Sequence, residues 1–381
     1  MAKRALDGLH VLDISTSVAG SWCSRWLADF GADAVVIEPP TGHAIRALGP
    51  FDDEGASILA SFLLANKRSV TLDLEQDQGR RLFLDLAGHA HVVVSSAPPS
   101  RLRALRLTSA DIANPALIMA HVTPHGMTGA LSDTPGNDLT VGARSGWASI
   151  NGLAGREPLK PANWQSSFCA GLATYGAIMA ALHHLDTHPG EGQEVDVAEL
   201  DVMVSTFAPA LLRGQYQGEA LQRRPEVDMT GGPVLVADGH FALTISRAHF
   251  WRDAMNLLGL HDLAEDPRWE SSWYRAAHKD DYVARVEERM REWPKMDLFR
   301  ELAGRRVVAG PVLTMPELAD NEHLHARGFW SSPGGTPGLP AFAGAPFRMS
   351  ATPWALRSPA PLPGEHSAEL LEGDLPGEQA S

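Results

Sequence analysis

Short apolar runs alternate with helical periods through the first half of the chain. Runs of four to six residues rich in Val, Leu and Ile are typical of buried strands. We predict strands at residues 9–13, 34–38, 69–74, 91–94, 116–120 and 193–197. Amphipathic stretches at residues 21–30 and 77–87 predict helices between them. Strands that alternate with helices indicate βαβ units, so we predict an α/β fold with a mostly parallel sheet.

A long apolar segment at residues 167–184 predicts a buried helix. Its most apolar part, residues 171–182, is too short to span a bilayer and ends in two histidines, His183 and His184. The chain has no internal repeat of 20 to 50 residues, so the sequence does not predict a solenoid.

The second half of the chain has a different pattern. Residues 215–232 are rich in Gly, Arg and Pro and predict a linker. Residues 234–243 alternate as a hairpin with a turn at Asp238-Gly239. Helical periods fill residues 250–306, and the Pro- and Gly-rich chain from residue 334 onward predicts surface coil. A second, smaller unit therefore follows the linker.

Composition narrows the function classes. The chain has 381 residues, 44% of them hydrophobic, which is enough for a large core without disulfides or metals. Its net charge of −14 argues against general nucleic-acid binding. Only two cysteines occur, Cys23 and Cys169, and they fit a reducing, cytoplasmic compartment. The N-terminus has no apolar run typical of a signal peptide, and there is no zinc-ligand spacing.

Six short motifs occur in order along the chain. They are GLHVLD at 8–13, LADFGAD at 27–33, NKRSVTLDL at 66–74, PGNDL at 135–139, GEGQEVDV at 190–197 and GEHS at 364–367. Their joint order resembles the family III (CaiB/BaiF) CoA-transferases. The resemblance implies a Rossmann-like large domain, a smaller α/β domain and an interlocked dimer. The implied division is 1–214 for the first part of the large domain, 215–330 for the linker and small domain, and 331–381 for a segment that returns to the large domain.

The resemblance also implies coenzyme A as the ligand, with an acyl-CoA and a small carboxylic acid as substrates and no metal. CoA carries phosphates, which Lys and Arg bind. The implied CoA-binding positions are Arg46, Asn66, Lys67, Arg68, Ser96, Arg103, Asn137 and Asp138. The Ser96-Ala97 dipeptide departs from the family, which usually has Asn-Phe at this loop.

The family's catalytic Asp is absent. In family transferases this Asp lies four residues before a Gly of the long apolar helix and attacks the acyl-CoA thioester. The corresponding residue is Ser167, four before Gly171, and no Asp or Glu occurs from residue 158 to 185. A slip of register finds Ser166 or Cys169 but no carboxylate.

Two interpretations of Ser167 remain. As an N-cap, it would accept a hydrogen bond from a helix amide, and this is the interpretation we favour. As a nucleophile, it would need a base within hydrogen-bond reach. His183 and His184 lie about 24 Å away along the same helix, at 1.5 Å per residue, whereas His121 and His125 lie on another segment that the sequence does not place. Cys169 is interpreted as a small buried residue.

The function that the resemblance predicts is therefore transfer of CoA between an acyl-CoA and a carboxylic acid. The alternative is a non-catalytic CoA-binding subunit, paired with a sister chain that carries the Asp. An α-methylacyl-CoA racemase is disfavoured, because its Asp and His correspond to Ser167 and Asn137, and Asn does not transfer protons. A dehydrogenase is excluded by the missing Gly-x-Gly-x-x-Gly after the first strand. The sequence does not identify the acyl group, and it does not show whether the protein assembles as a homomer or a heteromer.

Overall fold

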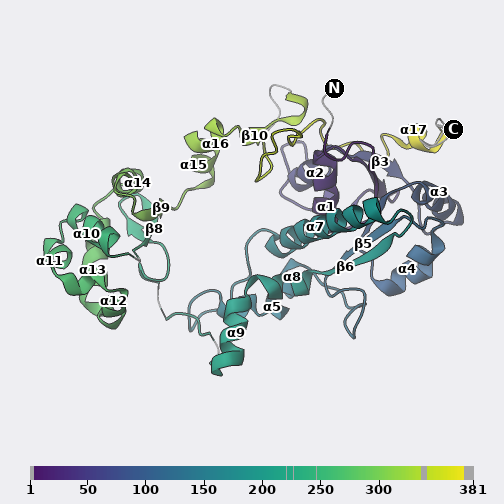
Figure 1. Ribbon diagram of the computed structural model, residues 1–381. Helices are drawn as coiled ribbons and strands as arrows, with labels where there is room; N and C mark the ends of the chain where they lie inside the picture. The colour runs from purple at the N-terminus through teal and green to yellow at the C-terminus, as the bar shows by residue number, and fades with distance from the viewer. Residues whose placement is uncertain (1–3, 220, 226, 246, 336–340, 373–381) are drawn as a thin grey trace. The chain divides into compact units, whose positions relative to one another are not determined.

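The computed structural model describes residues 4–372 except 220, 226, 246 and 336–340. The chain forms two compact units (Figure 1). The large unit contains residues 1–151, 158–221 and 324–381, and the small unit contains residues 152–157 and 222–323. The large unit is therefore built from separate stretches of the chain.

A six-stranded parallel sheet with the order β3-β2-β1-β4-β5-β6 forms the centre of the large unit. The strands are β1 (His10–Asp13), β2 (Asp33–Glu38), β3 (Arg68–Thr71), β4 (Val92–Ser95), β5 (Ile118–Thr123) and β6 (Gln193–Ala198). The predicted α/β fold and parallel sheet are confirmed. The order reverses between β1 and β4, which makes this pair the topological switch point of the sheet.

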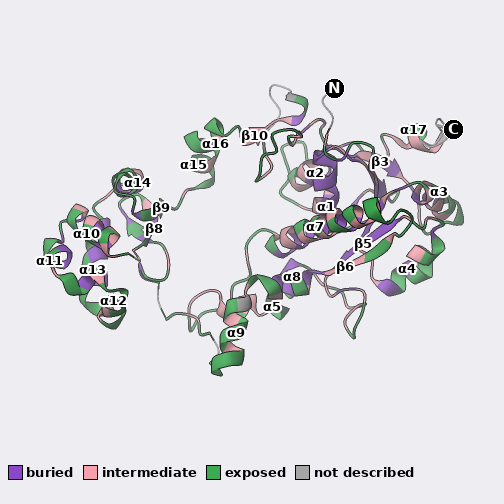
Figure 2. Cartoon of the chain, viewed as in Figure 1, coloured by how far each residue is buried: buried purple, intermediate pink, exposed green. Residues whose placement is uncertain are grey.

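Alternate residues of each strand pack on opposite faces of the sheet. Val11, Val94 and Ala120 belong to a core with α1 (Val18–Asp29) and α7 (Gln165–Thr187). The residues adjacent to these in the same strands belong to a core with α3 (Asp77–Gly88) and α4 (Pro99–Leu105), and they are Leu12, Val93 and Met119. This two-residue period explains why the strands are nearly continuous apolar runs. Figure 2 shows the resulting burial, with much of β5 in purple.

Short helices surround this framework. They are η1 (Ala44–Ala47), α2 (Ile58–Leu63), η2 (Ser109–Asp111), α5 (Asp138–Arg144), α6 (Trp147–Ile150), α8 (Glu199–Thr206) and α9 (Ala208–Gln217). The last stretch adds the two-stranded pair β10 (Trp330–Ser331) and β11 (Phe342–Ala343), the turn η4 (Pro333–Gly335) and α17 (Ser367–Glu372). Coil otherwise dominates the described residues after 334, as predicted.

Helices α1 and α7 pack closely because Gly171 has no side chain. A Cβ at Gly171 would lie 2.5 Å from the carbonyl oxygen of Ala19 and 3.0 Å from the Trp22 side chain. The rings of Trp22 and Phe168 then meet edge to face, with centroids 5.3 Å apart. The start of α7 is thereby held beside the start of α1. Among the described residues, α7 is the one helix long and apolar enough to cross a membrane, yet it packs as a helix of this domain on α1, β5 and β6.

The small unit is a three-stranded antiparallel sheet covered by helices. Its strands are β7 (Val234–Val236), β8 (Gly239–Thr244) and β9 (Val308–Pro311), paired in the order β7-β8-β9. Its helices are α10 (Ala248–Leu257), α11 (His261–Glu265), η3 (Pro267–Glu270), α12 (Ser272–Ala277), α13 (Lys279–Met290), α14 (Lys295–Gly304) and α15 (Met315–Ala319), and α16 (Glu322–Ala326) crosses the boundary between the units.

The predicted hairpin is present, but its turn lies one residue earlier than predicted. Val236 pairs with Gly239, so the two loop residues are Ala237 and Asp238. Asp238 uses its carboxylate to accept a hydrogen bond from the Lys295 amide at 2.7 Å, which fixes the turn on the start of α14.

Candidate functional site

The carboxyl ends of the parallel strands carry most of the polar groups of interest. At the switch point, the loop after β1 meets the loop after β4, and the amide of Thr16 donates to the Ser96 hydroxyl at 2.8 Å. Helix α1 starts in the same loop, where the Ser17 hydroxyl caps the helix by accepting from the Gly20 amide at 3.1 Å. In open α/β sheets this crevice is the usual ligand site.

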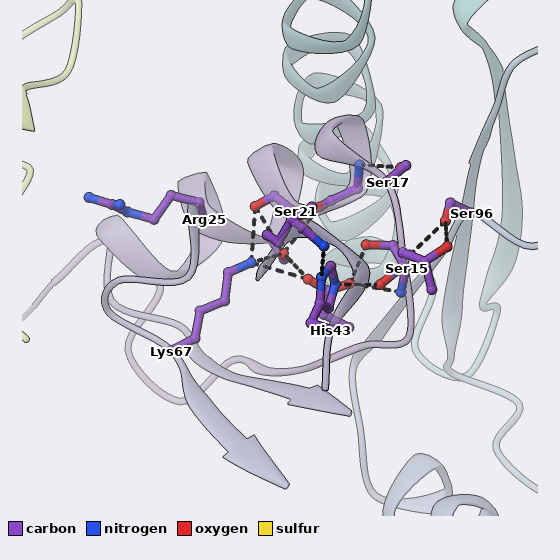
Figure 3. A network of polar contacts seen from close by, with 12 residues as sticks. Ser15, Ser17, Ser21, Arg25, His43, Lys67 and Ser96 are labelled. Atoms are coloured by element: carbon purple, nitrogen blue, oxygen red, sulfur yellow. Dashed lines mark hydrogen bonds and ion pairs between the residues drawn. The ribbon is translucent and has the colours of Figure 1, made fainter. Parts of the chain in front are cut away.

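A buried polar network fixes the loop after β1 (Figure 3). Asp13, at the end of β1, accepts hydrogen bonds from Lys67 at 3.1 Å, from the Ser24 hydroxyl at 2.5 Å and from the Ser15 hydroxyl at 2.6 Å. His43 contacts the Ser15 carbonyl through Nε2 at 2.7 Å. Burial alone would raise the Asp13 pKa, but Lys67, His43 and the two hydroxyls hold it below its ordinary value.

Lys67 belongs to this network. Its ammonium donates to Asp13, to the Ser21 carbonyl at 3.0 Å and to the Ser24 hydroxyl at 2.7 Å, so all three N–H donors have protein partners. Its side chain has no exposed surface. The ammonium is thus occupied inside the large unit.

The neighbouring basic positions are also paired with acids. Arg46 forms a two-bonded ion pair with Glu38, at 2.7 and 2.8 Å, and donates to the Pro361 carbonyl. Arg68 pairs with Asp33 and with Glu369. These contacts tie β2, β3 and the C-terminal stretch together.

Asn66 joins the large unit to its last stretch. Its amide group donates to Asp29 and to the Ala355 carbonyl, and its oxygen accepts from the Arg357 and Ser358 amides. Three of the sequence-predicted positions, Asn66, Lys67 and Arg68, line one cavity of about 420 Å³. The same cavity is also lined by Arg4, Arg357 and His366.

The basic residues of α4 are more open to solvent. The Arg103 side chain is 64% exposed and lies 4.0 Å from Asp133. Arg101 pairs with Glu75. Helix α4 begins at Pro99, shortly after Ser96 and Ala97, so these arginines belong to the helix that follows the switch-point loop.

Ser167 does not cap its helix, so the N-cap interpretation is wrong. Helix α7 begins at Gln165, and the cap position is Trp164, which makes no side-chain cap hydrogen bond. Ser167 is therefore the third residue of the helix, and it is buried. Its hydroxyl donates to the carboxylate of Glu199 at 3.3 Å.

Asp138 binds the start of α7 from outside the helix. Its carboxylate accepts from the Ser166 amide at 3.0 Å and from the Ser166 hydroxyl. Lys160 completes the pairing with a hydrogen bond of 2.8 Å. Asn137, the residue before it, is the N-cap of α5, with its side-chain oxygen accepting from the Thr140 amide at 3.1 Å. Both residues therefore position the two helix starts.

Glu199 is the carboxylate that the sequence did not reveal. It is the first residue of α8 and follows β6 directly, so it lies at the carboxyl edge of the sheet. It is 3% exposed. Burial raises the pKa of Glu199 to about 7; the hydrogen bond from Ser167 opposes this rise, and the negative charge of Asp138 adds to it. Its position after a predicted strand was the one sequence signal available.

Burial shifts the pKa values of the nearby cysteines and histidines toward their neutral forms. Burial raises the pKa of the Cys169 thiol and of the Cys23 thiol, so neither is a thiolate near neutral pH. Burial lowers the pKa of His121 and of His125, and both ring nitrogens of His125 lack a hydrogen-bond partner among the described residues. Ser167 donates to Glu199 and to neither histidine. No cluster of metal-ligating side chains occurs in the described part of the chain.

Comparisons with known proteins agree with this architecture. The sequence model of CoA-transferase family III matches residues 6–367. The chain belongs to this family. It is 31% identical to the succinate–glutarate CoA-transferase of Agrobacterium fabrum over 391 residues, which covers 97% of this chain and 95% of that protein.

Two further relatives bear on assembly and fold. The chain is 30% identical to the BbsE subunit of succinyl-CoA:(R)-benzylsuccinate CoA-transferase from Thauera aromatica, with 95% of this chain and 92% of that one covered. The crystal structure of a CaiB/BaiF family protein from Brucella suis superposes with a TM-score of 0.85 and 30% identity, covering 96% of this chain and 98% of that chain.

Proposed function

We propose that this protein transfers CoA between an acyl-CoA and a carboxylic acid. The observation that carries the proposal is the family match over residues 6–367. The named relatives act on succinyl-CoA or on succinate and glutarate, so short dicarboxylic acids are the first acceptors to test. The reaction uses CoA as a substrate and needs no metal.

The CoA is proposed to lie in the switch-point crevice between β1 and β4. Ser96 and Thr16 meet there, and the start of α1 offers backbone N–H groups to a phosphate or carbonyl oxygen. Arg103 supplies an exposed positive charge on the next helix. Lys67 is proposed to hold the wall of this region through Asp13, Ser21 and Ser24 and not to touch the phosphates, because it is buried and its three N–H donors are all bonded. Asn66 is proposed to be structural as well, since it bonds Asp29 at the other end of α1 and the last stretch of the chain.

Calorimetry with CoA and with succinyl-CoA tests this site. We expect binding that weakens as salt is added, since charge–phosphate attraction is screened. Arg103→Ala should weaken binding, whereas Arg81→Ala, an exposed arginine on α3, should leave it unchanged. If millimolar CoA produces no heat of binding, the proposed CoA site is refuted.

We propose an obligate dimer of interlocked chains, as the family resemblance implies. A folded monomer in sedimentation at micromolar concentration would contradict it. Both cysteines are free, in keeping with a reducing, cytoplasmic compartment.

A non-catalytic CoA-binding subunit is the second candidate, and Ser167 favours it, because this position has no carboxylate of its own. One relative is itself named as a subunit. Turnover separates the two functions. If it is a complete transferase, the purified chain alone should convert succinyl-CoA and glutarate into succinate and glutaryl-CoA. A subunit should bind CoA without turnover.

A further inference from the structure

Ser167 and Glu199 come together although 32 residues separate them in sequence. Ser167 lies in the first turn of α7, and Glu199 is the first residue of α8, directly after β6. The two residues are 4% and 3% exposed. A carboxylate is thus held beside the helix start where position 167 itself offers only a hydroxyl.

The partners of Glu199 differ from those of its neighbour Asp138. Asp138 has Lys160 at 2.8 Å and a backbone amide at 3.0 Å, so its charge is matched. Glu199 has the Ser167 hydroxyl and no cationic partner among the residues that the structure describes. A structural carboxylate at such a depth is normally paired with a cation, because burying an unpaired charge is costly. An unmatched carboxylate is a feature of sites that do chemistry.

The start of α7 adds a donor for a developing negative charge. The Ser167 amide has no hydrogen-bond partner among the described residues, whereas the Ser166 amide is bound by Asp138 and the Phe168 amide by the Trp164 carbonyl. An open N–H at a helix start stabilises an oxyanion, with the helix dipole acting in the same direction. The same corner therefore holds a buried carboxylate and an oxyanion donor.

The proposed reaction needs a carboxylate of this kind. Moving CoA from one acid to another without losing the thioester's energy requires intermediates of similar energy, and an enzyme carboxylate supplies them as an anhydride and a thioester. An ester on Ser167 would be too stable to return its acyl group to CoA readily. Resting on the proposed transferase function, we infer that Glu199 is the nucleophilic carboxylate of this chain.

The steps balance without any further reactant. An Oε atom of Glu199 bonds to the thioester carbon, the C–S bond breaks, and CoA leaves as thiolate. The thiolate then attacks the Glu199 carbonyl carbon of this anhydride, the donor acid leaves as carboxylate, and a Glu199–CoA thioester forms. The acceptor carboxylate attacks that thioester carbon and releases the thiolate again. The thiolate finally attacks the acceptor's acyl carbon, which frees the Glu199 carboxylate.

Trapping identifies the attacking group without knowledge of the acceptor. The full-length protein is mixed with succinyl-CoA, and separately with acetyl-CoA, and is then reduced with borohydride, which converts an enzyme thioester to an alcohol. We expect peptide mass spectrometry to find the alcohol at Glu199. Hydroxylamine in place of borohydride should leave a hydroxamate at the same residue.

Variants supply the second readout. Glu199→Gln should lower kcat for CoA transfer by on the order of 10³-fold or more and abolish the adduct. CoA binding should persist. Asp201→Asn, an exposed acid two residues further along α8, is the matched control and should keep both turnover and adduct. Ser167→Ala should still give the Glu199 adduct.

Each contrary outcome is decisive. An adduct on Ser167, or turnover by Glu199→Gln at the wild-type rate, overturns the assignment of Glu199 and leaves the transferase function standing. If the wild-type protein binds CoA but shows neither turnover nor an adduct, both the transferase function and the assignment of Glu199 are refuted. The protein is then a CoA-binding subunit.

Discussion

The ammonium of Lys67 lies 3.1 Å from the carboxylate of Asp13, and neither side chain has any exposed surface. Breaking such a pair on one side leaves an unmatched buried charge. We expect Lys67→Met to lower the free energy of unfolding by about 3–5 kcal/mol. Urea unfolding followed by circular dichroism measures this change.

A double variant controls for the lost charge. Asp13→Asn combined with Lys67→Met should recover part of the lost stability, because no charge is then left alone. If Lys67→Met folds as stably as the wild type and instead loses CoA binding, Lys67 is a ligand-binding residue and its structural role is refuted.

The raised pKa of Glu199 predicts a pH-dependent stability. Below about pH 4.5, the ordinary value, the carboxyl is protonated in both the folded and the unfolded chain. Between that value and about 7 only the unfolded chain loses the proton, so stability falls as pH rises and the loss is complete above pH 7. Glu199→Gln should therefore exceed the wild type by on the order of 3 kcal/mol at pH 8 and match it near pH 4.5.

Unfolding free energies at several pH values, taken as the difference between wild type and variant, isolate this one group. Asp201→Asn serves as the control, because Asp201 is exposed and should show no such difference. A pH-independent difference for Glu199→Gln would mean that the Glu199 pKa is the same in the folded and the unfolded chain, and a wild type that gains stability over the variant as pH rises would mean that the carboxylate is stabilised as an ion.

The α1–α7 contact predicts opposite effects at two glycines of one helix. Gly171→Ala would place Cβ 2.5 Å from the Ala19 carbonyl oxygen and should cost about 1–3 kcal/mol through overpacking. Gly176→Ala has open space around the new Cβ and should stabilise the protein by about 0.5–1 kcal/mol. Thermal unfolding of both variants under the same conditions compares them. Equal effects would show that α7 shifts freely against α1.

The substitution Ser167→Asp, which introduces the family's acid at position 167, should create repulsion with the Glu199 carboxylate. An Asp is favourable in the first turn of a helix, but two carboxylates at this distance do not both ionise readily. We expect Ser167→Asp to be less stable than the wild type at pH 8 and close to it at pH 5. In the Glu199→Gln background the same substitution should cost less stability at pH 8 than it does in the wild type, because the neighbouring negative charge is gone. Stabilisation by Ser167→Asp alone at pH 8 would show that the two side chains lie apart in solution.

Much of the large unit could be predicted because its strands are short, apolar and buried on both faces. All six predicted strands exist, with ends shifted by up to three residues, and the helix predicted at 77–87 spans Asp77–Gly88. The start of α7 was misjudged because a serine in the first turn looks like a cap, while the cap position is Trp164 in a left-handed conformation. Backbone geometry of this kind has no pattern in the sequence.

The candidate site was harder to predict than the fold. The sequence around Ser167 contains no acid, but Glu199 contacts Ser167 from the start of α8, 32 residues later. The burial of Lys67 was also invisible, because the partners that satisfy it come from β1 and α1. Sequence spacing records neighbours along the chain, and both features depend on neighbours across the sheet.

The discontinuous large unit has a consequence for synthesis on the ribosome. The amide of Ser69 in β3 bonds to the ring of His366, 297 residues later, and Asn66 is completed only by Arg357 and Ser358. The nascent sheet therefore emerges with one edge uncovered and waits while the whole small unit is translated. Until the last turn of chain leaves the exit tunnel, that edge is open to other strands, and a stalled or truncated product would be prone to aggregate.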